Sequence, residues 1–268
     1  MASILALSRA EQERSKKLMS RRLYAHGVTL ALGIAALWLS EPYTYGAAVG
    51  ALVSEALAWS FRRAAQEGHV RAEEGRRRAL VAREMGADVG SLVTAELLAQ
   101  FSSKSRQIAP QWEDDDYYST KGRPAPERFQ AALQESAFWS SRLYEIAARR
   151  GYIRLGALTA VLIMLLLVLG AAGGGDFLVV AARVATVFFV TLIGIDEIGQ
   201  VSGFQDAARV SRRTVQELER IDPRRHEQML NVFADYAVAT ATAAPIPTKI
   251  YKQHHDVIED AWKIRQSS

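Results

Sequence analysis

The chain has 268 residues, a formal net charge of +4 and no cysteine. The lack of cysteine excludes disulfides, thiolate metal sites and a cysteine nucleophile. The mean hydropathy is near zero, as in globular proteins. That average hides a division, because apolar residues are concentrated at 24–61 and 155–195 while the rest of the chain is highly charged.

The two apolar regions predict four membrane spans in two hairpins. Leu155 to Ala172 and Phe177 to Ile195 are long apolar runs, and Gly27 to Leu39 and Gly46 to Phe61 are shorter ones. A helix needs about 20 apolar residues to cross about 30 Å of hydrocarbon. A cleaved signal peptide is the alternative for the first run, and a buried core of a soluble helical protein is the alternative for both hairpins.

Lys and Arg residues gather beside the predicted spans and are missing from the two hairpin turns. By the positive-inside rule, both termini are expected in the cytoplasm. The excess of Lys and Arg residues is then explained by the orientation of the spans and by attraction to anionic lipid. We therefore expect no DNA or RNA partner. The expected class is an all-α, multi-pass membrane protein with four transmembrane helices, a cytoplasmic helical insert and a helical C-terminal tail. Its segments are 1–25 (N-terminal), 26–61 (first hairpin), 62–153 (insert), 154–199 (second hairpin) and 200–268 (tail).

Helical periodicity predicts the elements of the insert and the tail. Apolar residues from Val81 to Phe101 fall on one helix face, and a second helix begins near Pro126, where proline is well tolerated. In the tail, Asp222 followed by proline starts one helix, and the APIPT break at 244–248 opens the last one. No segment alternates with period two, so no strand is expected.

A loop at 102–126 separates the two helices of the insert. A loop of this length is usually functional or disordered. Its aromatic side chains can stack on bases and its cations can meet phosphates. A mobile acidic loop is the alternative. The residues expected to bind an anionic nucleotide are Trp112, Tyr117, Tyr118, Lys121 and Arg123, with Lys249, Tyr251 and Lys252 from the tail.

Four charged residues in or beside the predicted spans are further candidates. Glu55 and Arg183 lie inside spans at depths that allow them to pair, and separation of that pair would be part of opening. A static pair, or an arginine that reaches the interface, is the alternative. Asp196 and Glu197 could form acidic rings in an oligomeric pore, or be solvated at the membrane edge.

Known catalytic motifs are missing from the sequence. It contains no GxxxxGK[ST] loop, GxSxG elbow, HExxH motif or dinucleotide fingerprint. The acidic run at 114–116 is typical of solvated like charges rather than of a cation site. We therefore expect no enzyme activity, no catalytic residue, no metal and no cofactor.

Three stretches carry a resemblance to a known family. They are DDDYYS after Trp112, FWSSRLYEIAARR before the third predicted span, and PIPTKIYKQHHDVIEDAW near the C-terminus. In this order around four spans, they resemble the SMODS-associated four-transmembrane effector family. The resemblance implies a bacterial antiphage effector that damages the inner membrane when a neighbouring synthetase makes a cyclic-oligonucleotide messenger. It transfers no ligand residue to a position of this chain.

The functional expectation is a homo-oligomeric effector. It would permeabilise or disrupt the bacterial inner membrane when a cyclic oligonucleotide or dinucleotide activates it. The alternative is a membrane-anchored scaffold or adaptor that recruits a partner through its cytoplasmic helices.

Overall fold

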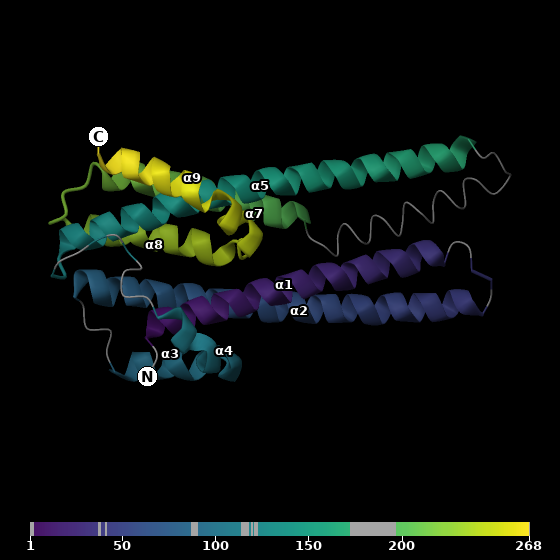
Figure 1. The fold of residues 1–268 in the computed structure, drawn as a ribbon, viewed down its shortest axis with the longest axis horizontal. Coiled ribbons are helices and arrows are strands. Elements are labelled where there is room, and N and C mark those ends of the chain that lie inside the picture. The colour runs from purple at the N-terminus through teal and green to yellow at the C-terminus, as the bar shows by residue number, and fades with distance from the viewer. Residues whose placement is uncertain are drawn as a thin grey trace. The chain divides into compact units, whose positions relative to one another are not determined.

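The computed structural model describes residues 3–36, 39–40, 42–86, 91–113, 118, 120, 123–171 and 197–267. All secondary structure in these ranges is helical, which confirms the predicted all-α fold. The elements are α1 (Ile4–Ala35), α2 (Tyr43–Leu80), the π-helical turn η1 (Val81–Met85), α3 (Ser91–Gln100), α4 (Ser103–Ile108), the 3-10 turn η2 (Ala109–Trp112), α5 (Pro126–Ala171), α7 (Glu197–Leu218), α8 (His226–Thr242) and α9 (Thr248–Gln266). The α-helices are labelled in Figure 1.

The chain divides into two compact units. Unit 1 consists of Met1–Lys16, Ala65–Ala148 and Ser202–Ser268, and unit 2 consists of Lys17–Ala64 and Arg149–Val201. Helices α1, α2, α5 and α7 contribute residues to both units. Unit 1 additionally contains α3, α4, α8 and α9.

In unit 1, α1 packs closely against α2 because the facing residues are small. A Cβ atom on Gly75 would lie 2.2 Å from the Ser8 hydroxyl oxygen, and one on Gly68 would lie 2.5 Å from the Ser15 hydroxyl oxygen. In each helix the two residues are seven positions apart, which is the repeat that keeps one face toward a partner helix. The contact is therefore a seam of glycine and serine.

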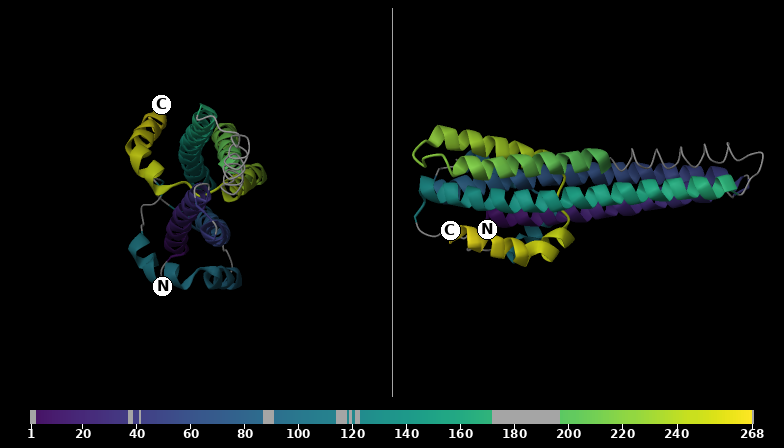
Figure 2. Two further views of the ribbon diagram at one scale, coloured as in Figure 1. Left: turned by 90° about the vertical axis from the view of Figure 1, so that its right-hand side faces the viewer. Right: turned by 90° about the horizontal axis from the view of Figure 1, so that it is seen from above.

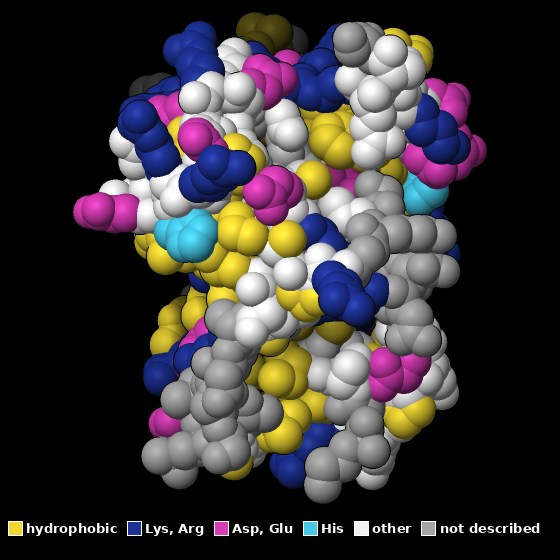
Figure 3. Space-filling view, turned by 90° about the vertical axis from the view of Figure 1, so that its left-hand side faces the viewer, with side chains coloured by type: hydrophobic (Ala, Val, Ile, Leu, Met, Phe, Trp, Pro, Cys, Tyr) yellow, Lys and Arg dark blue, Asp and Glu magenta, His cyan; other side chains and the backbone are white. Residues whose placement is uncertain are grey.

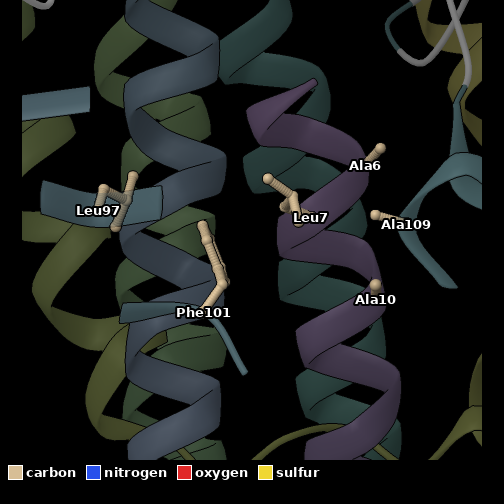
Figure 4. Packing of buried hydrophobic residues seen from close by; sticks show 6 residues of the cluster. All are labelled: Ala6, Leu7, Ala10, Leu97, Phe101 and Ala109. Carbon is tan, nitrogen blue, oxygen red and sulfur yellow. The ribbon is translucent and has the colours of Figure 1, made fainter. Parts of the chain in front are cut away.

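A small apolar cluster in unit 1 joins the beginning of α1 to α3 and to the chain after α4. Ser102 caps α4, since its hydroxyl accepts a hydrogen bond of 3.1 Å from the Ser105 backbone N–H. The buried residues of the cluster, shown in Figure 4, are Ala6, Leu7, Ala10, Leu97, Phe101 and Ala109.

Aromatic pairs fill the space between α5 and the C-terminal helices of unit 1. Helix α5 begins at Pro126, as predicted. Figure 2 shows α5, α8 and α9 from two further directions. The ring centroids lie 5.5 Å apart for Phe129 and Phe233, 5.2 Å for Phe138 and Trp262, and 5.9 Å for Tyr144 and Phe204.

The helix predicted from Val81 to Phe101 is interrupted. The π-helical turn ends at Met85, and Gly86 follows with a φ of 71°, in the left-handed region that favours glycine. A new helix begins only at Ser91. The turn η1 carries the buried carboxylate of Glu84, which pairs with the Arg128 guanidinium of α5.

The predicted membrane architecture is contradicted. Among the described residues, none of the helices is both long enough and apolar enough to cross a membrane. This finding overturns the four-span fold class and the multi-pass location in the bacterial inner membrane, together with the topology derived from it.

The first predicted hairpin shows the physical reason. Its apolar runs are short parts of long charged helices, since α1 carries Arg22 and α2 carries Glu55. The third predicted span belongs to α5, where the side chains of 162, 165, 166 and 168–171 lie outside the described ones. The fourth, Phe177 to Ile195, lies wholly outside the described residues.

Candidate functional site

The loop residues predicted to bind a nucleotide are only partly described. Trp112 packs against the apolar cluster of unit 1, and the Arg9 guanidinium lies 5.3 Å from its ring centroid. Tyr118 is buried and lines a pocket of about 340 Å³, together with Arg83. Arg123 is exposed. Tyr117 and Lys121 lie outside the described residues.

The predicted tail residues lie on α9. Lys249 and Lys252 are exposed. The ring of Tyr251 lies 6.0 Å from that of Trp139 on α5 and 5.3 Å from that of His255. The structure thus places two aromatic rings beside Tyr251. The nucleotide-binding role of Lys249, Tyr251 and Lys252 stays a prediction.

Glu55 has a partner that the sequence did not reveal. Its carboxylate Oε2 lies 3.0 Å from Nδ1 of His26 within unit 2. Burial lowers the pKa of His26, although the Glu55 carboxylate raises it. Arg183, the predicted partner of Glu55, lies outside the described residues. The Glu55–Arg183 pair therefore stays a prediction.

The predicted acidic ring is described for one residue only. Glu197 is buried at the start of α7, and its carboxylate lies 2.7 Å from the Arg154 guanidinium. A charge neutralised in this way contributes less field to a pore than a solvated one. Asp196 lies outside the described residues.

Unit 2 carries most of the large exposed hydrophobic side chains of the described chain. Tyr24 is 78 % exposed and Leu52 is 72 % exposed. Monomeric proteins rarely expose large contiguous apolar patches, and such patches mark interaction sites. We call the set the unit 2 apolar surface: Leu23, Tyr24, Val28, Leu39, Tyr43, Tyr45, Val49, Leu52, Val53, Leu57, Trp59, Tyr152, Ile153, Val161, Ile163, Met164, Leu167 and Ile198.

Unit 1 has a buried polar network between α2, α5 and α8. At its centre the Glu73 carboxylate lies 2.8 Å from Arg76 and 3.8 Å from Arg77. The Thr240 hydroxyl donates a hydrogen bond to it at 3.5 Å. Burial raises the pKa of Glu73, but the two arginines and His69 together hold it below its usual range. The carboxylate is therefore charged and compensated.

The hydroxyl of Tyr236 links this centre to α5. It lies 2.8 Å from the Ser140 hydroxyl, 3.0 Å from the Ser136 hydroxyl and 3.4 Å from the Arg76 guanidinium. Burial is the largest cause that raises the pKa of the neighbouring Tyr144. Tyr144 consequently stays a neutral hydrogen-bonding group in the physiological range.

His69 completes the network. Its Nε2 donates to the Thr240 carbonyl oxygen at 3.1 Å, and a carbonyl can only accept, so Nε2 carries the proton. Nδ1 is buried and has no hydrogen-bond partner among the described residues. Burial lowers the pKa of His69, and Arg76 and Arg77 lower it further. A neutral imidazole with an unpaired acceptor results.

The sequence pattern did not predict this network. The stretch RRAAQEGHVRAEEGRRRA (62–79) reads as a charged continuation of a span, yet it supplies Glu73 and His69. One signal could have revealed a buried face: Ala65, Gly68, Ala72 and Gly75 recur at spacings of three and four inside the charged run.

We predict that acid destabilises unit 1 through His69. The folded pKa of His69 lies below its unfolded value, so the unfolded chain binds more protons. The contribution to stability is complete above the unfolded pKa of about 6.5 and is lost as the pH falls below it. Urea unfolding between neutral and mildly acidic pH should show this decline, and His69→Gln should flatten it. His226→Gln, which changes an exposed histidine, should leave the decline unchanged.

The charges of one end of the molecule are mixed in sign. Figure 3 shows Lys and Arg side chains interspersed with Asp and Glu side chains on that face. A nucleic-acid-binding face usually gathers basic residues into one patch. The expected lack of a DNA or RNA partner stays a prediction.

The functional proposal rests on these geometric observations and on the sequence. Searches against protein-family models, against curated proteins and against solved structures found no match for the chain.

Proposed function

We propose that this protein is an effector of bacterial antiphage defence, activated by a cyclic oligonucleotide, that then disrupts a lipid bilayer. The unit 2 apolar surface carries the proposal, because apolar side chains in such number favour contact with lipid or protein over water. The resemblance to the SMODS-associated effector family supplies the activating ligand. The homo-oligomer expected from the sequence belongs to the same proposal.

Basic residues of unit 2 support lipid as the surface that is contacted. Arg21, Arg62 and Arg63 lie on the same two helices as much of the apolar surface, and Arg149 and Arg150 lie at the beginning of the α5 segment. Each basic residue near an anionic bilayer contributes about 1 kcal/mol of attraction. The combination of apolar area and cations is typical of proteins that bind at an anionic lipid surface.

The expected activity is leakage that depends on the ligand. Purified protein is added to dye-filled vesicles of phosphatidylglycerol and phosphatidylethanolamine, with a panel of cyclic di- and trinucleotides. One member of the panel should release the dye, and protein without ligand should release little. Leu52→Glu places a charge on the apolar surface and should lower the rate about tenfold or more, since burial of one leucine contributes about 1.5–3 kcal/mol.

Val257→Glu is the matched control for that variant. Val257 is 69 % exposed but lies on α9 in unit 1, so its replacement should leave leakage unchanged. Equal loss in both variants would contradict a specific role of unit 2. Sealed vesicles with every ligand would favour the adaptor alternative, in which the apolar surface binds a protein partner.

A further inference from the structure

A groove lies between α1 and α2 within unit 2. Its volume is about 480 Å³, within the range of small-molecule sites. The side chains of Val28, Val53, Leu57 and Phe61 form apolar walls. None of these four residues can donate or accept a side-chain hydrogen bond, so the groove is suited to a hydrocarbon chain.

The floor of the groove is closed by close packing and by satisfied polar groups. Gly50 lines it, and a Cβ atom there would lie 3.1 Å from Cδ1 of Leu32 on the facing helix. The Ser54 hydroxyl donates to the Ala25 carbonyl oxygen at 2.8 Å. A polar ligand would therefore find few unpaired groups along the floor.

The charge at one end of the groove is positive. Arg21 lines the groove, is exposed, and has no hydrogen-bond or ion-pair partner among the described residues. The described parts of the α1–α2 hairpin in unit 2 contain five Lys and Arg residues, all at positions 17–22 and 62–63, and a single acid, Glu55. The five cations outnumber this acid, whose carboxylate lies 3.0 Å from Nδ1 of His26.

We propose that the groove binds the acyl chain of an anionic lipid and that Arg21 binds the headgroup. The chain would run from Arg21 and Phe61 toward Val28 and Gly50. Residues 21–28 of α1 span about 10 Å at 1.5 Å per residue. Apolar walls with one unpaired cation at the end match a single amphiphile with a negative head and an apolar tail. The inference rests on the proposed function in one respect, since the bound lipid would come from the bilayer on which the protein acts.

The test measures binding of single lipids to the purified protein, without vesicles and without any cyclic nucleotide. Lysophosphatidic acid and lysophosphatidylcholine of equal chain length are titrated below their critical micelle concentrations by calorimetry. We expect the anionic lipid to bind more tightly. Arg21→Gln should weaken the binding of lysophosphatidic acid about fivefold, the equivalent of about 1 kcal/mol. Arg209→Gln, which removes an exposed cation of unit 1, should not weaken it.

A second pair of variants tests the groove itself. Val53→Trp fills it and should abolish binding, whereas Ala56→Trp changes an exposed residue of the same helix that does not line the groove, and should leave binding intact. Circular dichroism identifies a variant that fails to fold. The proposal is overturned if the two tryptophan variants bind alike, if Arg21→Gln leaves the anionic preference unchanged, or if Val53→Trp alters self-association in place of lipid binding. Since no bilayer is present, a failure of vesicle leakage leaves this result standing.

Discussion

Glu73→Ala is expected to lower the free energy of unfolding by about 3–5 kcal/mol, which is the range for removal of one partner from a buried ion pair. The carboxylate is buried and lies 2.8 Å from Arg76. Without it, the guanidinium groups of Arg76 and Arg77 remain close together in a poorly solvated space. Urea denaturation followed by circular dichroism measures the change.

The neighbouring residue is a matched control for this variant. Glu74 pairs with Arg78 at the surface, where ion pairs contribute about 0–1 kcal/mol. Glu74→Ala should therefore change stability by 1 kcal/mol at most, about the limit for an exposed pair. An equal effect of the two substitutions would show that the Glu73 network does not support unit 1.

Gly75→Leu is expected to destabilise unit 1 by about 3 kcal/mol, at the upper end of the range for overpacked cores. A Cβ atom at this position would lie 2.2 Å from the Ser8 hydroxyl oxygen and 2.9 Å from Cζ of Phe101. The Phe101 ring is fully buried and cannot move aside without opening the apolar cluster. Thermal unfolding monitored by circular dichroism provides the measurement.

Gly46 on the same helix offers the control. No atom lies within 4 Å of a Cβ placed there, so Gly46→Leu should not clash. It should even favour the helix, because glycine is about 1 kcal/mol worse than good helix formers. A Gly75→Leu variant as stable as Gly46→Leu would disprove the close approach of α1 and α2.

Local signals predicted the helical elements well where turn and cap residues are distinctive. The start of α5 at Pro126 and the break before α9 follow from proline. The interruption at Gly86 was missed, because the apolar spacing from Val81 to Phe101 continues through it. Periodicity records which face is apolar, and it does not record whether the backbone stays helical between two turns.

The membrane spans were predicted from the length of apolar runs, and this rule led to the wrong architecture for the described helices. The length of an apolar run does not take account of the charged and polar residues in the rest of the same helix. Just before the first predicted hairpin, Arg22 is buried beside His26, with 3.3 Å between Nε and Nε2, and His26 in turn pairs with Glu55. These polar contacts join two helices that the sequence presented only as apolar segments.

The buried polar network of unit 1 was the hardest part to predict. It joins Glu73 and His69 of α2 to Tyr236 and Thr240 of α8, which are more than 160 residues further along the sequence. Single-sequence reasoning has no means to pair them. The seam between α1 and α2 was missed for another reason, since glycine and serine produce no apolar stripe.

That seam has a consequence for alignment of the two helices. Because Ser8 and Ser15 repeat at seven residues, as do Gly68 and Gly75, sliding α1 by one heptad would still match a serine with a glycine. Small residues alone therefore do not define one alignment.

Glu11 removes the ambiguity. Its buried carboxylate lies 3.1 Å from the Arg71 guanidinium and accepts a hydrogen bond of 2.9 Å from the Ser102 hydroxyl. A shift of seven residues, about 10 Å along the axis, would separate the carboxylate from both of these partners and leave it with Arg14 of its own helix, 3.0 Å away. A single acid in the seam thus specifies the register of the two helices, in the way that one polar core residue selects the alignment of a coiled coil.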